Sequence, residues 1–171
     1  MDLEKIIRDI PDFPKPGILF KDITTLLKDP TALKESIEQM KQLFADEKID
    51  KVCGIESRGF IFGVPLAIEL GCGFVPIRKN GKLPWTKYSQ EYSLEYGTDK
   101  LEVHVDAIDK GERVLVVDDL LATGGTANAV TQLLNKMEAD IRGFSFLIEL
   151  GFLNGREKLV DQRVEALIKY D

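Results

Sequence analysis

The sequence contains few of the residues that build metal clusters and catalytic triads. Its 171 residues include only two cysteines and one histidine. Cys53 and Cys72 lie in separate apolar segments without CxxC spacing, so we expect two free, buried thiols and no disulfide. A single histidine excludes a His/Cys zinc cluster, and a Ser-His-Asp triad would have to use His104. Because His104 falls in the alternating stretch LEVHV, we predict that it is a strand residue.

Positive charge and long apolar runs are also scarce. Lysine and arginine total 23 against 29 acidic residues, and the resulting net charge of −6 argues against a nucleic-acid surface. No apolar run approaches the roughly 20 residues that span a bilayer, so we expect no membrane partner. The first residues, MDLEKIIRDI, alternate charges with aliphatic side chains and lack a signal-peptide core, which predicts a cytoplasmic protein.

The length and composition are typical of one globular domain with a sizeable core. Hydrophobic residues make up 44% of the chain and charged residues 30%. We therefore predict a single domain over residues 1–171, with a small N-terminal hood over about residues 1–30.

The apolar pattern predicts an α/β fold. The expected strands alternate with helices and are apolar on both faces, as in a parallel sheet covered by helices. Pro11 to Gly17, rich in proline, should be stiff and extended. The expected helices cover about residues 2–8, Pro30 or Thr31 to Phe44, 59–70 (closed by Gly71) and 126–139; the expected strands cover 49–55, 72–79, 101–105, 114–119, 144–150 and 164–170.

Residues 80–100 fit neither a covered helix nor a core strand. They are polar but include Trp85, Tyr88, Tyr92 and Tyr96. A polar segment of this length between strands is usually a functional flap or disordered. A flap is our interpretation, and a plain surface hairpin is the alternative.

The stretch VLVVDDLLATGGT, residues 114–126, indicates a ligand site. An apolar strand is expected to end at Asp118 and Asp119, at the sheet edge where ligands of open parallel sheets bind. Both acids should be exposed there, because unpaired buried charge costs several kcal/mol. The hydroxyls of a ribose could satisfy this pair, directly or through a metal ion.

The small residues that follow predict a phosphate cradle. Glycines let backbone N–H groups converge on one centre, and the N-terminus of the next helix adds partial positive charge. Two threonine hydroxyls add donors. The predicted cradle consists of Ala122, Thr123, Gly124, Gly125 and Thr126. A P-loop and a dinucleotide-binding loop are excluded, because GxxxxGK[ST] and GxGxxG are both absent.

The same stretch resembles the phosphoribosyl-pyrophosphate signature of the type I phosphoribosyltransferases. Further segments resemble the adenine-specific members of that family, in order and spacing, over nearly the whole chain. They are DFPKPGILFKDIT, GIESRGFIFG, PIRKNGKLP and YSLEYGTDKLEVH. The resemblance implies that loop 122–126 holds the 5-phosphate and that Asp118 and Asp119 face the ribose hydroxyls.

The resemblance also implies where the pyrophosphate binds. Glu56, Ser57 and Arg58 match the family's pyrophosphate loop, in which a cis peptide often stands where Glu56 meets Ser57 here. Arg58 would reach the leaving group. The cationic residues Arg78, Lys79 and Lys82 would neutralise its charge. Magnesium is expected to accompany the pyrophosphate, coordinated mostly by substrate oxygens and water, with no dedicated cage of protein ligands.

Adenine recognition and catalysis are assigned through the same resemblance. Phe20 would stack on the base, the backbone of Leu19 would bind its edge, and Lys21 stands where relatives often have arginine. Glu95 and Tyr96 match the tip of the family's catalytic flap, over about residues 80–100, where Glu95 would handle the proton of the imidazole ring. Trp85 stands where many bacterial relatives have a polar or basic residue.

The family's activity is the transfer of a phosphoribosyl group from phosphoribosyl pyrophosphate to adenine, giving AMP and pyrophosphate in purine salvage, usually by a homodimer. Two alternatives remain. One is a transferase of the same fold acting on hypoxanthine, xanthine or orotate, and the other is a regulator that binds phosphoribosyl pyrophosphate without catalysis.

Overall fold

The computed structural model describes residues 1–93 and 97–171. The chain forms two compact units, Met1–Gln39 and Met40–Asp171, and the boundary falls inside helix α2 (Pro30–Leu43). The prediction of one domain with a hood over about residues 1–30 stays a prediction. No helix among the described residues is both long and apolar enough to cross a membrane.

The first unit contains a two-stranded antiparallel hairpin. A short 3-10 turn, η1 (Glu4–Ile6), leads into β1 (Arg8–Pro11), which pairs with β2 (Leu19–Asp22). The expected helix over residues 2–8 is therefore wrong. Arg8 instead opens the ladder opposite Asp22, and its Nε donates to the Asp22 carboxylate at 3.0 Å. This pairing over 14 residues overrides the local helical pattern.

The proline-rich segment is also different from the expectation. Pro11 ends β1, and the chain then turns back through a cis Phe13–Pro14 bond. Asp12 and Gly17 adopt positive φ angles of 56° and 85°, which an extended segment would not contain. The backbone N–H of Phe13 closes the turn by donating to the carbonyl of Ile18 at 3.2 Å.

A one-turn helix, α1 (Thr24–Leu27), precedes the predicted long helix α2. α2 begins at Pro30, as expected, but its cap is Asp29, not Pro30 or Thr31. The Asp29 carboxylate accepts the backbone N–H groups of Thr31 and Ala32 at 2.9 and 3.1 Å. A proline at the first helical position costs no hydrogen bond, because that N–H would have no partner in the helix.

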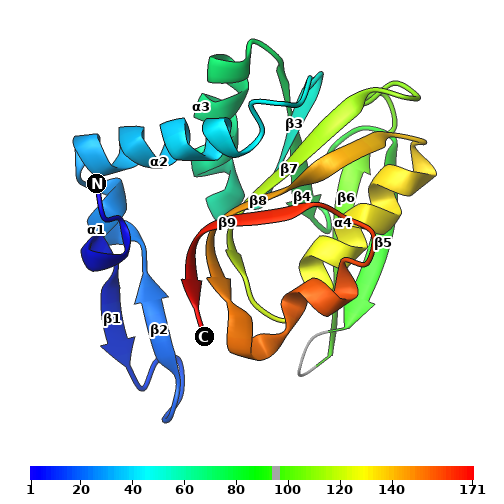
Figure 1. The fold of residues 1–171 in the computed structure, drawn as a ribbon. Coiled ribbons are helices and arrows are strands. Elements are labelled where there is room, and N and C mark those ends of the chain that lie inside the picture. The colour runs from blue at the N-terminus through cyan, green and yellow to red at the C-terminus, as the bar shows by residue number, and fades with distance from the viewer. Residues whose placement is uncertain (94–96) are drawn as a thin grey trace. The chain divides into compact units, whose positions relative to one another are not determined.

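The second unit is a seven-stranded sheet with the order β5-β6-β4-β3-β7-β8-β9 (Figure 1). Five neighbouring strands of the sheet are parallel, in the order β4-β3-β7-β8-β9. This confirms the predicted fold class of a central parallel sheet flanked by helices. The elements are β3 (Lys51–Ile55), α3 (Arg58–Leu70), β4 (Gly73–Lys79), β5 (Lys87–Ser93), β6 (Thr98–His104), β7 (Arg113–Leu121), α4 (Gly125–Lys136), β8 (Asp140–Leu150), η2 (Gly151–Leu153), η3 (Gly155–Lys158) and β9 (Val164–Tyr170).

Several strands of this sheet differ from the sequence-based expectation: β5 was not predicted, and β8 begins at Asp140, four residues before the predicted start. β6 begins at Thr98, three residues before the predicted start, and runs antiparallel to both β4 and β5. The segment interpreted as a flap therefore supplies a hairpin that extends the sheet. β7 continues past the two acids to Leu121, because β8 pairs with it as far as Leu121.

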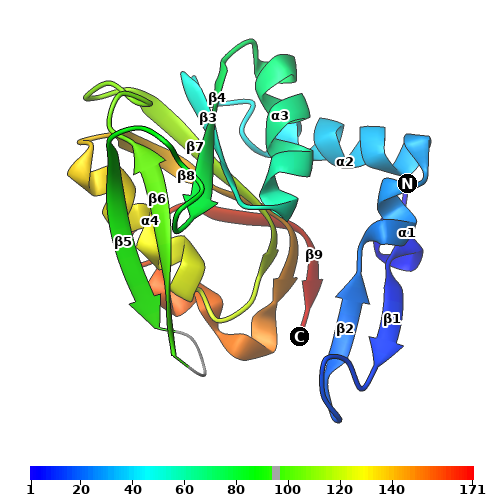
Figure 2. The same cartoon turned by 180° about the vertical axis from the view of Figure 1, so that it is seen from behind.

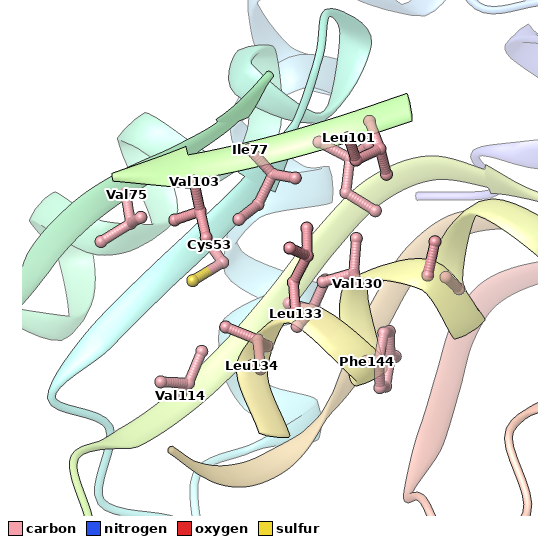
Figure 3. Close-up of a cluster of buried hydrophobic side chains, with 14 of the residues drawn as sticks. Cys53, Val75, Ile77, Leu101, Val103, Val114, Val130, Leu133, Leu134 and Phe144 are labelled. Carbon is pink, nitrogen blue, oxygen red and sulfur yellow. The ribbon is translucent and has the colours of Figure 1, made fainter. Parts of the chain in front are cut away.

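Helices α3 and α4 cover opposite faces of this sheet. α3 packs on β3 and β7, and Figure 2 shows it beside these strands. α4 covers the other face, where its apolar side chains point toward those of the strands (Figure 3). The cluster includes Cys53, Ile77, Val116, Val130, Leu133, Leu134 and Phe144. The core therefore packs against β3 and β7, which pair side by side in the sheet.

The cysteines and the histidine lie as predicted, with one exception. Both cysteines are free, and Cys53 is fully buried, but Cys72 is only half-buried. His104 is a strand residue whose Nε2 accepts the backbone N–H of Trp85 at 3.3 Å.

Candidate active site

A cavity of about 340 Å³ lies at the carboxyl ends of β3 and β7. After β3 the chain crosses to β4 on one side, and β7 lies on the other side of β3. The loops that follow β3 and β7 therefore diverge, which leaves a crevice at this switch point, the usual ligand site of open α/β sheets. The described residues that line it are mainly Ile55–Arg58 and Asp118–Ala127, with Lys79, Tyr92, Asp99, Leu101 and Phe146.

The predicted phosphate cradle forms one wall of this cavity. All five of its residues line the space, and α4 starts at Gly125. Gly124 has a φ of 78°, so its left-handed conformation favours glycine. The loop thus presents a helix N-terminus, with its unpaired N–H groups and partial positive charge, to the cavity. This arrangement suits a phosphate group without any lysine.

The acids Asp118 and Asp119 both line the cavity, but their exposure differs from the prediction. They lie inside β7, at the point where the neighbouring β3 has ended, because the β3–β7 ladder stops at Val117. Asp119 is only 3% exposed, whereas Asp118 is half-buried. The prediction that both acids are exposed was therefore wrong, because β7 continues beside β8 and Arg58 forms an ion pair with Asp119.

The charges of this pair are held in an unfavourable environment. Burial and the nearby charge of Asp119 raise the pKa of Asp118 well above the usual carboxyl range. Burial also raises the pKa of Asp119, against the opposing charge of Arg58. Oδ1 of Asp118 accepts the backbone N–H of Asp119 at 2.9 Å. Hydroxyl donors or a cation from a ligand would relieve the remaining cost.

Arg58, at the start of α3, forms an ion pair with Asp119 of β7 across the cavity lining. Its Nε lies 3.0 Å from Oδ2 of Asp119, an ion pair without the alignment of a hydrogen bond, so that oxygen accepts no hydrogen bond from the described residues. About half of the Arg58 side chain is exposed, so it remains available to an anion in the cavity. The peptide between Glu56 and Ser57 is cis, as the family resemblance implied. All three residues of this loop line the cavity.

The predicted cationic patch divides in two. Lys79 lines the cavity, and its Nζ lies 3.1 Å from Oδ2 of Asp99. Arg78 and Lys82 do not line it. Nε of Arg78 donates to Glu56 at 3.1 Å, and this hydrogen bond lowers the pKa of Glu56. Arg78 thus fixes the pyrophosphate-loop candidate from outside the cavity.

Tyr92 and Asp99 line the cavity although the sequence analysis assigned them no role. They stand opposite each other in the β5–β6 ladder, and the Tyr92 hydroxyl lies 3.2 Å from Oδ2 of Asp99. Burial raises the pKa of Tyr92, whereas the backbone N–H of Lys100 lowers that of Asp99. Only the hairpin register brings them together, and no local motif signals that register.

The predicted base-binding residues belong to the first unit, where contacts within the β1–β2 hairpin position them. Phe20 packs edge-on against Phe13, with ring centroids 5.1 Å apart. Pro11 stands opposite Leu19 in the ladder and has no N–H to donate across it. Lys21 forms an ion pair with Asp9 at 2.7 Å. The hairpin therefore presents an aromatic ring next to a strand backbone.

The predicted flap tip, Glu95 and Tyr96, lies outside the described residues. In the same predicted flap segment, Trp85 is 64% exposed. The residues that the structure describes contain no group of three or more His, Cys, Asp or Glu side chains arranged to hold a metal ion. The Asp118–Asp119 pair and its orphaned oxygen nevertheless fit a cation or hydroxyl donors that arrive with a ligand.

Comparison with known proteins agrees with this geometry. Residues 22–158 match the family model of the phosphoribosyl transferase domain. A protein of Acaryochloris marina named adenine phosphoribosyltransferase is 61% identical over 170 residues, which cover 99% of this chain and 100% of the relative. This chain belongs to the adenine phosphoribosyltransferase family.

Solved structures of the family have the same fold. The adenine phosphoribosyltransferase of Thermoanaerobacter pseudethanolicus superposes with a TM-score of 0.96 at 51% identity, over 99% of this chain and 98% of the other. The enzyme of Saccharomyces cerevisiae, solved with an imino-altritol bisphosphate and adenine, gives a TM-score of 0.92 at 40% identity, over 97% and 96% of the two chains.

Proposed function

We propose that this chain catalyses the transfer of the 5-phosphoribosyl group from phosphoribosyl pyrophosphate to adenine, giving AMP and pyrophosphate in purine salvage. The observation that supports it most strongly is the cavity at the switch point, where a helix-capping glycine loop, the half-buried Asp118 and the buried Asp119 meet an arginine. Full-length identity of 61% to an adenine phosphoribosyltransferase supports the choice of base.

The sugar phosphate is proposed to bind in the cavity between β7 and α4. Its 5-phosphate accepts hydrogen bonds from the backbone of residues 122–126, and the ribose hydroxyls bond Asp118 and Asp119. The raised pKa values of both acids support this assignment, because donors from the sugar would stabilise carboxylates that the protein leaves under-compensated.

The pyrophosphate is proposed to lie near Ser57, Arg58 and Lys79. Charge develops on the leaving oxygen as the anomeric C–O bond breaks, and fixed cations there lower the barrier. Lys79 would exchange its ion pair with Asp99 for the pyrophosphate. Part of the pyrophosphate charge would be neutralised by Mg²⁺, held mainly through substrate oxygens and water.

Adenine is proposed to stack on Phe20, while the Leu19 backbone bonds the purine edge and Lys21 supplies a nearby positive charge. Glu95 is assigned to the proton of the imidazole ring and Tyr96 to the same flap tip. Closure of this segment would exclude water from the electrophilic sugar carbon.

We also propose that the protein acts as a homodimer in the cytoplasm. Free cysteines are typical of a reducing compartment. Helix α3 exposes Ile61, Val64 and Ile68 at helical spacing, with 39%, 41% and 74% of each residue exposed. Such a stripe suits burial against a second copy. Light scattering after size-exclusion chromatography would give the mass of a dimer, or that of a monomer if this is wrong.

Initial rates with four bases test the proposed function. With phosphoribosyl pyrophosphate and Mg²⁺, adenine should give AMP faster than hypoxanthine, xanthine or orotate gives its nucleotide. Preference for a 6-oxo purine would overturn the choice of base. Binding of phosphoribosyl pyrophosphate without turnover of any base would instead favour a non-catalytic regulator.

A further inference from the structure

The segment that follows β8 lies directly against the phosphate loop. A Cβ atom added to Gly124 would come within 2.3 Å of the carbonyl oxygen of Gly155, and one added to Gly155 within 2.3 Å of the carbonyl oxygen of Ala122. Gly155 is buried but does not line the cavity. The loop therefore has the cavity on one side and the Gly155 backbone on the other.

The residue after Gly155 anchors this segment to the sheet. Nε and Nη2 of Arg156 donate to the two carboxylate oxygens of Glu149 at 2.6 and 2.7 Å. Nη1 donates to the carbonyl of Val164 at 2.6 Å. Glu149 lies near the end of β8 with only 4% of its side chain exposed, and Val164 starts β9. One guanidinium thus ties η3 to two strands.

A glycine-rich loop needs such support, because glycine gains the most conformational freedom when it is not held. An anion site formed by backbone N–H groups binds well only when those groups are already oriented toward one centre. Loop 122–126 has only alanine, threonine and glycine residues, whose small side chains fix a backbone conformation poorly by themselves. The Gly155 backbone supplies a rigid surface behind the loop.

We propose that Gly155 and the Arg156–Glu149 pair form a brace that holds residues 122–126 in their phosphate-binding conformation. Arg156 is then a positioning residue: it touches no substrate and acts through Gly155 on the loop. The inference rests on the proposed function, since it assigns the braced loop to the 5-phosphate of the sugar.

Three variants test the brace. Gly155→Ala places a methyl group against the Ala122 carbonyl. Glu149→Leu with Arg156→Met removes the ion pair without leaving a buried charge unpaired, a change that stability often tolerates. Arg156→Lys retains a cation for Glu149 but loses the planar fork, so it is the variant that best preserves folding. The matched control is Asp50→Leu with Arg113→Met, which removes a second forked pair at the amino end of the sheet.

The readouts separate loop positioning from general damage. Calorimetry should show ribose 5-phosphate binding roughly 10- to 100-fold more weakly to the first two variants, as expected for losing one or two charge-assisted hydrogen bonds. Arg156→Lys should lie between them and wild type. KM for adenine and kcat at saturating phosphoribosyl pyrophosphate should change less than about threefold. The control should bind ribose 5-phosphate like wild type.

Two results would overturn the brace. The first is an unchanged affinity: Arg156→Lys, together with one of the other two variants that folds, binds ribose 5-phosphate within twofold of wild type. The second is an equal loss in the control pair, which would indicate a general effect of stability. Failure of wild-type protein to bind ribose 5-phosphate or to form AMP would instead contradict the proposed function, so the two failures are distinguishable.

Discussion

The carboxylates at the two ends of strand β7 lie in opposite electrostatic environments. At the amino end, both oxygens of Asp50 accept hydrogen bonds from the Arg113 guanidinium, at 2.7 and 2.6 Å, and these bonds lower the pKa of Asp50. At the carboxyl end, burial raises the pKa of Asp118 and Asp119. The same strand, β7, therefore begins beside a fully paired carboxylate and ends near two carboxylates whose charge is only partly compensated.

This difference separates stability from binding. A lowered carboxyl pKa favours the folded protein at neutral pH, whereas a raised one disfavours it. Asp50 at the amino end therefore stabilises the folded protein. Asp118 and Asp119 at the cavity lower its stability and remain available to a ligand. Removing an acid at the cavity should therefore lower activity and raise stability. Removing Asp50 at the amino end should lower stability and leave activity nearly unchanged.

The largest effect is expected from Arg58→Ala at the cavity end. Loss of a fixed cation beside the leaving group should lower kcat by roughly 10²- to 10³-fold, the usual cost of removing one transition-state donor. Steady-state kinetics with adenine measure this, and Arg58→Lys, which keeps the charge, should lose less. Unchanged turnover of Arg58→Ala would reject the leaving-group role.

Gly124→Ala should come next. Its Cβ would clash with the Gly155 carbonyl, and its φ of 78° is unfavourable for alanine. The displaced loop should reduce kcat/KM for phosphoribosyl pyrophosphate by about 10²-fold, as a misplacement of about 1 Å can. Gly81→Ala is the control, because Gly81 also has a positive φ of 79° but nothing near its Cβ position. Equal losses in both would show that strain alone is responsible.

Asp118→Asn sharpens the comparison because activity and stability should move in opposite directions. The amide oxygen can still accept the Asp119 N–H, but the ribose loses a charged acceptor, which should cost about tenfold in kcat/KM. Removing a charge whose pKa is raised should increase Tm at pH 7 by about 2–4 °C. This gain should disappear as the pH falls toward 4, where the wild-type carboxyl is also neutral. Melting curves across this pH range check the sign, and a lower Tm at pH 7 would contradict it.

Asp50→Asn at the amino end should have the smallest effect on activity, within about twofold of wild type by the additivity expected for distant sites. The Tm of this variant should be lower than that of wild type at pH 7. The lowered pKa of Asp50 stabilises the folded protein at every pH above the pKa that this aspartate has in the unfolded chain. The difference should narrow as the pH falls below about 4. A loss of activity as large as that of Asp118→Asn would remove the distinction between the two ends.

Much of the sheet could be predicted because its signals are local. β3, β7 and the second half of β8 contain apolar runs, and Gly71 ends α3 as predicted, with a left-handed φ of 68°. The hairpin of β1 and β2 was missed because it depends on pairing across many residues, which outweighs the short helical pattern of the first residues. The cap was predicted one or two residues too late: Asp29, which caps the N–H groups of Thr31 and Ala32, precedes a proline at the first helical position.

The same contrast between local motifs and long-range contacts holds for the site. Loop 122–126 and Glu56 to Arg58 are contiguous motifs, and the structure brings both to one cavity. Tyr92 and Asp99 reach the cavity only through strand register, and Gly155 reaches the back of loop 122–126 only through the path of the chain after β8; no local pattern encodes either. The burial of Asp119 was also unpredictable, because it depends on how far β8 extends beside β7.

The central claim is that the loop between β7 and α4 holds the 5-phosphate of phosphoribosyl pyrophosphate. A crystal structure with this ligand and Mg²⁺ tests it most directly. The phosphate should lie within hydrogen-bond distance of the backbone N–H groups of residues 122–126, with the ribose hydroxyls on Asp118 or Asp119. A ligand bound with its 5-phosphate elsewhere, and this loop unoccupied, would contradict the account.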